Sequence, residues 1–135
     1  MLSDPRFGAA VSVFDVQPHV DERGRLYSVE FDSLPFQPQR MFFISPSRAG
    51  ESRGGHAHEI AHQLLICAMG RIDVAVAFNG TEQTFRMERP GQAIHLAPQV
   101  WAMQRYLTCD AMLLVLSSEP YDASSYSTYQ PARHT

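Results

Sequence analysis

Short runs of alternating hydrophobic and polar residues, separated by turn-forming residues, make up most of this chain. The clearest run is 71–78, in which every second residue is a large apolar one. A period of two places those side chains on one face of a strand. Asn79-Gly80 follows at once, and this pair favours a tight two-residue hairpin. The pattern therefore predicts a strand over 71–78 and a return strand over 82–87.

Further strands are predicted where β-branched, aromatic or aliphatic residues gather between turn signals. They cover 11–16, 26–31, 40–45, 63–68, 92–97, 101–107 and 111–117. No segment before residue 118 keeps a helical period over about eleven residues. This many short strands predict an all-β sandwich or barrel, and we interpret residues 1–135 as a single domain. The polar tail 121–135 is interpreted as a short helix or as a loop across the mouth of the barrel.

Charge and hydropathy narrow the class of partner. The net charge is −3 and no basic run occurs, which argues against a nucleic-acid partner. No apolar run approaches the length of a membrane span, so no membrane partner is expected. The first residues lack the apolar core of a signal peptide, and we expect a cytoplasmic protein.

The most informative motif is the glycine- and histidine-rich stretch 50–63, which is closed by Gly70. His56 and His58 are two residues apart, so in an extended strand both side chains leave the same face. Two imidazoles aimed into one cavity can bind a metal or move protons. The motif alone leaves both possibilities open.

The stretch resembles the first motif of the cupin superfamily, with Gly50, His56, His58 and Gly70 in the matching positions. This resemblance implies a jelly-roll barrel of antiparallel strands. Metal-binding cupins use both histidines, a glutamate and a later histidine. Here Gln63 takes the place of the glutamate, and the second motif supplies no histidine.

An amide oxygen is a poor ligand for a transition metal, so we expect no metal and no other cofactor. Two further histidines remain as possible additions to the pocket. His62 follows His58 closely, and its direction is open. His95 lies on the face opposite Ile94 and Leu96, and it is a candidate to point into the barrel.

A narrower resemblance covers nearly the whole chain. The sequence is similar to the sugar 3,4-ketoisomerase family, which acts on dTDP-4-keto-6-deoxyglucose and includes the WxcM-like C-terminal domains. The matching segments are 21–24, 34–36, 40–44, 53–58, Gln63, 98–101 and 116–122, followed by Tyr126. The Arg-Gly-x-His-Ala-His core and the late Tyr-Asp pair are distinctive in combination.

The resemblance implies an enzyme of deoxyamino-sugar biosynthesis that moves a ketone from C4 to C3 through an enediol. This reaction needs a base to remove the C3 proton and a donor to protonate C4. Histidine titrates near neutral pH and can do both. By the family pattern His56 is the base at C3, and His58 orients it or handles the second proton, although the two roles remain interchangeable.

The same resemblance suggests the residues that bind a dTDP-sugar. Arg53 is placed to polarise the ketone or to grip the diphosphate, and Arg40 lies at a strand start near the same cavity. Gln63 and His95 are further binding candidates. Trp101 either stacks on the base or sugar, or is a core aromatic at a strand start. The family also implies a homodimer with N-terminal strands exchanged or paired.

Two departures from the family pattern keep other functions open. The strand that commonly carries a tyrosine has Phe42 and Phe43, and Ala102 stands where a histidine often follows the tryptophan. A catalytically silent cupin that binds a nucleotide sugar, as a sensor or accessory subunit, is therefore an alternative. A metal-dependent cupin enzyme such as a dioxygenase is a third. The sugar, the product configuration and the nucleotide base are not determined by the sequence.

Overall fold

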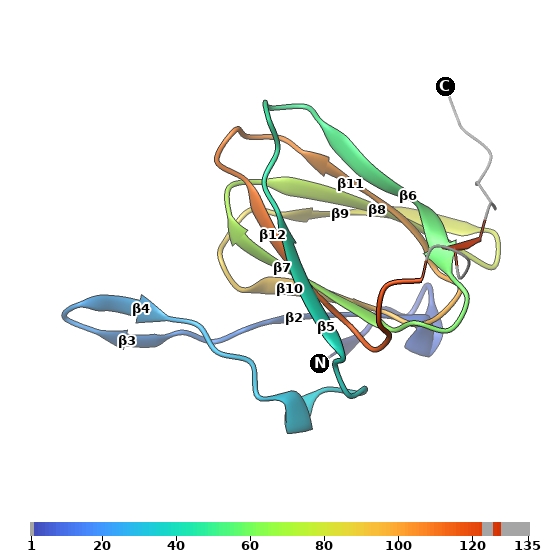
Figure 1. The fold of residues 1–135 in the computed structure, drawn as a ribbon, viewed down its shortest axis with the longest axis horizontal. Coiled ribbons are helices and arrows are strands. Elements are labelled where there is room, and N and C mark those ends of the chain that lie inside the picture. Colours follow the sequence, from blue (N-terminus) through green and yellow to red (C-terminus); the bar gives the residue numbers. More distant parts are fainter. Residues whose placement is uncertain (1, 123–125, 128–135) are drawn as a thin grey trace.

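Two antiparallel sheets packed face to face form the body of the protein (Figure 1). The computed structural model describes residues 2–122, 126 and 127. One sheet has six strands in the order β1-β2-β10-β7-β12-β5, and the other has five in the order β13-β6-β11-β8-β9. The strands and 3₁₀ turns are β1 (Leu2–Ser3), η1 (Gly8–Ala10), β2 (Val11–Asp15), β3 (His19–Asp21), β4 (Gly24–Leu26), η2 (Phe31–Ser33), β5 (Arg40–Ile44), β6 (Ser52–His58), β7 (Gln63–Met69), β8 (Ile72–Phe78), β9 (Thr81–Met87), β10 (Gln92–Leu96), β11 (Trp101–Tyr106), β12 (Met112–Ser117) and β13 (Tyr126–Ser127). The predicted all-β jelly-roll barrel is confirmed.

The hairpin formed by β8 and β9 shows how local sequence determines the sheet. Phe78 pairs with Thr81, and the two residues between them form the turn. Asn79 has a φ of 50° and Gly80 a φ of 76°, the left-handed values that such a turn requires. The predicted strand and its return are therefore confirmed.

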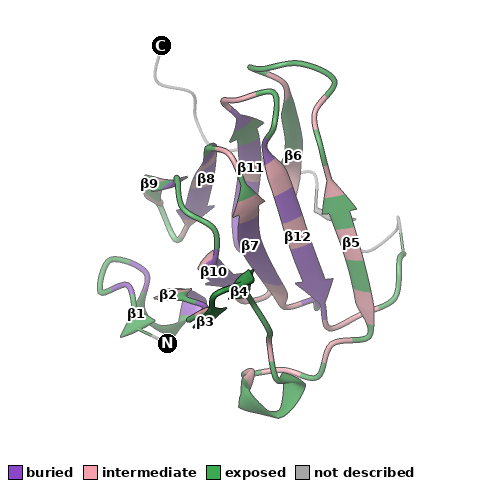
Figure 2. Ribbon diagram, turned by 90° about the vertical axis from the view of Figure 1, so that its left-hand side faces the viewer, coloured by how far each residue is buried: buried purple, intermediate pink, exposed green. Residues whose placement is uncertain are grey.

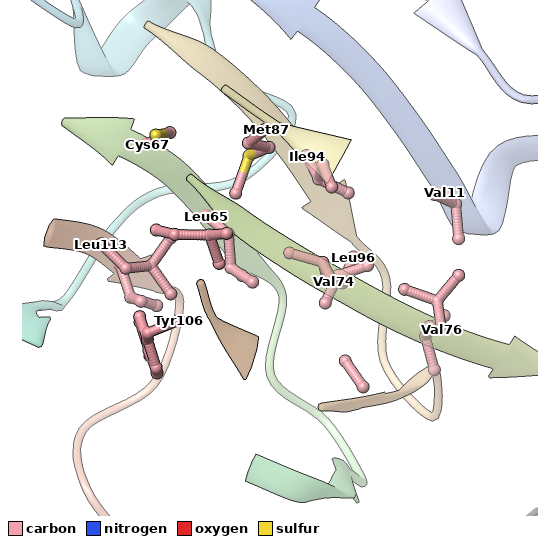
Figure 3. Close-up of a cluster of buried hydrophobic side chains, with 14 of the residues drawn as sticks. Val11, Leu65, Cys67, Val74, Val76, Met87, Ile94, Leu96, Tyr106 and Leu113 are labelled. Atoms are coloured by element: carbon pink, nitrogen blue, oxygen red, sulfur yellow. The ribbon is translucent and has the colours of Figure 1, made fainter. Parts of the chain in front are cut away.

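The main core lies between the two sheets (Figure 3). Leu65 and Ile94 enter it from the six-stranded sheet, and Val74 and Val76 from the five-stranded one. The inner strands β7 and β12 of the six-stranded sheet are largely buried, whereas β5 at its edge alternates between intermediate and exposed residues (Figure 2). The barrel thus has a closed apolar interior and one more open side at β5.

A second apolar layer covers the outer face of the six-stranded sheet. Leu64 and Leu116 point outward there and contact Val29, Leu34 and Phe36. The prediction of a strand over 26–31 is wrong, because β4 ends at Leu26 and the following residues pair with no strand. Of the residues that follow β4, Val29 packs on the outer face of the sheet, whereas Tyr27 and Phe31 are 37% and 47% exposed.

The β3–β4 hairpin projects away from the barrel (Figure 1). All six of its residues are exposed, and they include Val20 at 64% and Leu26 at 62%. Most of the tail 121–135 lies outside the described residues, although β13 pairs with β6 there. Within residues 2–122, 126 and 127, no helix has the length and apolar character needed to cross a membrane.

Candidate active site

A cavity of about 200 Å³ opens into the barrel between β5, β6, β7 and β11. Its polar side chains come from six residues, Arg40, Arg53, His56, His58, Gln63 and Gln104. Aliphatic side chains such as Leu65, Leu96 and Val115 complete the wall. A few convergent polar groups in an otherwise apolar hollow are typical of a small-molecule site.

His56 and His58 project into this cavity from β6, as the two-residue spacing predicts. Their ring centroids are 5.3 Å apart, and the rings are inclined at 79°. Ala57 between them is buried on the opposite face, against Trp101. The strand therefore presents two imidazoles to one small volume.

A β-bulge brings Arg53 to the same side as the histidines. Residues three apart on a regular strand face opposite ways. Here Ala102 pairs with His56 and Met103 pairs with Gly54, so Gly55 has no partner on β11. The extra residue reverses the alternation, and Arg53 lines the cavity at its exposed mouth.

Glycine is required at this bulge. Gly54 has a φ of +91° and Gly55 a φ of +84°, where other residues are strained. A Cβ on Gly54 would lie 3.0 Å from the Ala102 carbonyl oxygen and 3.0 Å from Gln104 Oε1. Gly54 and Gly55 thus allow the bulge that directs the Arg53 side chain into the cavity.

Two of the polar residues, Arg40 and Gln63, reach the cavity from the six-stranded sheet. Arg40 starts β5 and Gln63 starts β7, and both pair with Ser117 of the intervening strand β12. Phe42 lines the cavity from β5, whereas Phe43 faces outward and is 61% exposed. Of the two phenylalanines that stand where the family commonly has a tyrosine, only Phe42 faces the cavity. A tyrosine hydroxyl could therefore enter the cavity from position 42 but not from position 43.

Burial and charge keep both cavity histidines neutral near pH 7. Burial lowers the pKa of His56. The pKa of His58 falls to about 4, first because of burial and then because of the nearby charges of His56 and Arg40. A neutral imidazole has a free ring nitrogen that can accept a proton. Each ring is thus available as a base.

Two of the predicted binding residues do not line the cavity. Trp101 precedes Ala102 on β11 and so faces the other way, where it packs on Ala57 and Ala77. His95 also points outward, because its neighbours Ile94 and Leu96 fill the barrel core. The expectation that His95 points into the barrel is wrong, and Trp101 is a core aromatic.

His95 instead forms a cluster with His62 and Phe36 on the outer face. Nδ1 of His62 and Nε2 of His95 are 3.0 Å apart, and the two rings are stacked at 7°. Phe36 stacks on both rings. Burial, and then the charge of His62, lowers the pKa of His95 to about 4. Within the described part of the chain, no three His, Cys, Asp or Glu side chains are grouped as a metal-ligand set.

Sequence reasoning missed Gln104 and the apolar part of the cavity wall. Gln104 is buried and lines the cavity two residues after Ala102. The alternation along the predicted strand 101–107 could have found it, because Ala102 and Gln104 share a face. Val100 and Ala61 come from loops and carry no periodic signal.

Fold and site together define a cupin-type barrel with a histidine-lined cavity for a small molecule. The model of the WxcM-like, C-terminal family (FdtA) matches residues 9–132. The chain belongs to this family.

Individual relatives agree with this assignment. The chain is 29% identical over 115 residues to the TDP-4-oxo-6-deoxy-alpha-D-glucose-3,4-oxoisomerase of Aneurinibacillus thermoaerophilus, covering 84% of this chain and 83% of that protein. The structure of QdtA, a sugar 3,4-ketoisomerase from Thermoanaerobacterium thermosaccharolyticum in complex with TDP, is similar with a TM-score of 0.83 and 28% identity, over 89% of this chain and 88% of that one. The WlaRB TDP-quinovose 3,4-ketoisomerase of Campylobacter jejuni is similar with a TM-score of 0.82 and 27% identity, over 88% and 92%.

Proposed function

We propose that this protein is a sugar-nucleotide 3,4-ketoisomerase that acts on a TDP-linked 4-keto-6-deoxyhexose. The observation that carries the proposal is the pair of neutral histidines that face one cavity beside Arg40 and Arg53. The family and the named relatives support the substrate class.

The reaction is an internal tautomerisation that leaves the composition of the sugar unchanged. A base removes the proton from C3, and the electron pair of that bond forms a C3–C4 double bond as the C4 ketone becomes an enolate. The enolate oxygen takes up a proton to give the enediol. Loss of the proton on the C3 oxygen then restores a ketone at C3, while C4 receives a proton. No electrons leave the sugar, so this chemistry calls for no redox cofactor.

In this proposal His56 is the base at C3, and the neutral His58 accepts the proton from the C3 oxygen and passes it to C4. Both rings lie within one small cavity, with centroids 5.3 Å apart, which suits proton transfers at adjacent carbons. Arg40 and Arg53 carry positive charge at the wall and the mouth of the cavity. Such charges stabilise the developing enolate and bind the diphosphate. Gln63 and Gln104 offer neutral hydrogen-bonding groups to the sugar hydroxyls.

The direct test is NMR of TDP-4-keto-6-deoxyglucose with the protein in D₂O. We expect deuterium at C4 of the 3-keto product as it forms, and at C3 of the remaining 4-keto substrate through the reverse reaction. His56→Asn should slow the exchange at C3 by about a hundredfold or more, as loss of a general base does. Its affinity for TDP should stay near that of the parent, because the ring faces the sugar.

The outcomes separate the candidate functions. TDP binding without exchange by the parent protein would indicate a silent nucleotide-sugar binder. Loss of exchange on treatment with a chelator would indicate a metal enzyme. Normal turnover by His56→Asn would remove this histidine from the mechanism.

We further propose that residues 1–135 act as one domain in the cytoplasm and pair as a homodimer. The β3–β4 hairpin supports pairing, because it projects from the barrel with exposed Val20 and Leu26. A hairpin of this kind is marginal without a partner surface. Light scattering should give the mass of a dimer, and Val20→Asp combined with Leu26→Asp should give that of a monomer.

A further inference from the structure

Arg40 lies against two aromatic rings at the wall of the cavity. Its guanidinium carbon is 4.5 Å from the ring centroid of Phe42 and 5.1 Å from that of Tyr121. Both distances are within the range of favourable cation–π contact. Phe42 is on the same strand and lines the cavity, whereas Tyr121 comes from the segment after β12.

A set of hydrogen bonds brings Tyr121 back over Arg40. Gln39 N donates to Ser117 O at 2.8 Å, which joins the start of β5 to the end of β12. Ser117 Oγ then accepts from Glu119 N at 3.2 Å and donates to Glu119 O at 3.1 Å. Ser118 N donates to His62 O at 3.0 Å, and its Oγ accepts from His62 N at 2.8 Å. The turn that precedes Tyr121 is therefore fixed on two sides.

We propose that Tyr121 is a positioning residue whose ring holds the Arg40 guanidinium at the cavity wall, where its charge acts on the bound sugar nucleotide and on His58. The contact with Arg40 is made by the ring face. Phenylalanine offers a similar face, so the phenol hydroxyl is not what this role requires. For its enzymatic readout the inference rests on the ketoisomerase function proposed above.

The electrostatics of His58 support this role. Burial is the largest cause of its low pKa, and among the described residues the charges of His56 on the same strand and then of Arg40 on β5 lower it further. The neighbouring strand β7 contributes the neutral Gln63 to the same cavity. If Arg40 leaves its place, the positive charge beside His58 is removed, and the pKa of His58 rises by the part due to that charge while the effect of burial remains.

Tyr121→Phe and Tyr121→Ala form the matched pair that tests the inference. Tyr121 is 63% exposed, so truncation leaves no buried void. We expect Tyr121→Phe to match the parent. Tyr121→Ala should lose about three- to thirtyfold in kcat/KM, the factor that corresponds to one cation–π contact. In the pH–rate profile of Tyr121→Ala, the apparent pKa that belongs to His58 should be higher than in the parent. Phe31→Ala, which removes an exposed ring of η2 away from the cavity, should change neither quantity.

An NMR titration of His58 in the parent and in Tyr121→Ala gives a readout that needs no turnover. A higher His58 pKa in the alanine variant, with that of Tyr121→Phe unchanged, supports the positioning role. Equal titrations and equal pH profiles for all three proteins would overturn it. An inactive parent would overturn the proposed function alone, whereas an unchanged Tyr121→Ala beside an inactive His56→Asn would overturn this inference alone.

Discussion

Arg53 and His56 face the same cavity although three residues separate them, because Gly55 is left unpaired opposite β11. A regular strand would send the guanidinium to the outer surface. The cationic mouth of the site therefore depends on one inserted glycine. Through this bulge, both ends of the Arg-Gly-Gly-His sequence contribute side chains to the cavity.

We expect Gly54→Ala to damage the site, with Gly50→Ala as its control. Both glycines have similar positive φ values, +91° and +93°, so both variants should lose roughly 1–2 kcal/mol of unfolding free energy. At Gly54 the added methyl group also meets the Ala102 carbonyl oxygen at 3.0 Å, whereas at Gly50 it meets no atom within 4 Å. Only Gly54→Ala should therefore lower isomerase activity as well. Thermal unfolding and the D₂O exchange assay measure the two effects, and equal activity in both variants would contradict this account of the bulge.

Arg53→Ala should weaken the binding of TDP by about 10- to 100-fold, the effect of losing a charge-assisted hydrogen bond. Isothermal titration calorimetry with TDP measures the change. Arg105→Ala is the control, because Arg105 is an exposed arginine of β11 whose partner on β6 is Ser52, beside Arg53. Equal affinity in both variants would place Arg53 outside the ligand site.

Acid should destabilise the protein through the buried His95. Its pKa is about 4 in the folded protein, against an ordinary value of 6.5, because of burial and the charge of His62. Between these values the unfolded chain binds a proton that the folded chain does not, so stability falls as the pH drops from 6.5 to 4. The loss should be roughly 2–3 kcal/mol.

Urea unfolding at a series of pH values measures this slope. His95→Phe should reduce it, with the remainder due to His58, whose pKa is also about 4, whereas His19→Phe, at an exposed position of the β3–β4 hairpin, should leave it as in the parent. A slope in His95→Phe equal to that of the parent would assign the acid sensitivity to other groups.

Phe42→Tyr should raise kcat, because the new hydroxyl would enter the cavity and could donate a hydrogen bond to the developing enolate oxygen. Phe43→Tyr makes the same chemical change on the outward face of the same strand, where the side chain is 61% exposed, and should have no effect. Turnover of TDP-4-keto-6-deoxyglucose followed by NMR compares the two. A gain in neither variant would mean that the cavity already has the proton donor it needs.

Local patterns predicted much of the fold. The alternation over 71–78 and the Asn79-Gly80 turn were sufficient for the β8–β9 hairpin, since both depend on neighbouring residues only. The spacing of His56 and His58 likewise predicted their common direction. These features are local consequences of strand geometry.

The features that sequence reasoning missed depend on contacts between distant segments. Alternation along β10 predicts that His95 and Ile94 lie on opposite faces of the strand, but it does not determine which face lines the barrel interior. The bulge at Gly55 is visible only once β11 supplies the register. The same holds for Val29, whose side chain packs on a sheet formed by strands much later in the chain.

Trp101 is the single tryptophan of the chain and lies buried on β11, next to the strand that carries the two histidines. Its backbone pairs with that of Ala57, the residue between His56 and His58, and its side chain lies on the face of the sheet away from the cavity. Its fluorescence is therefore an intrinsic optical probe of that strand. Ligand titrations and unfolding can be followed at this position without a dye or label.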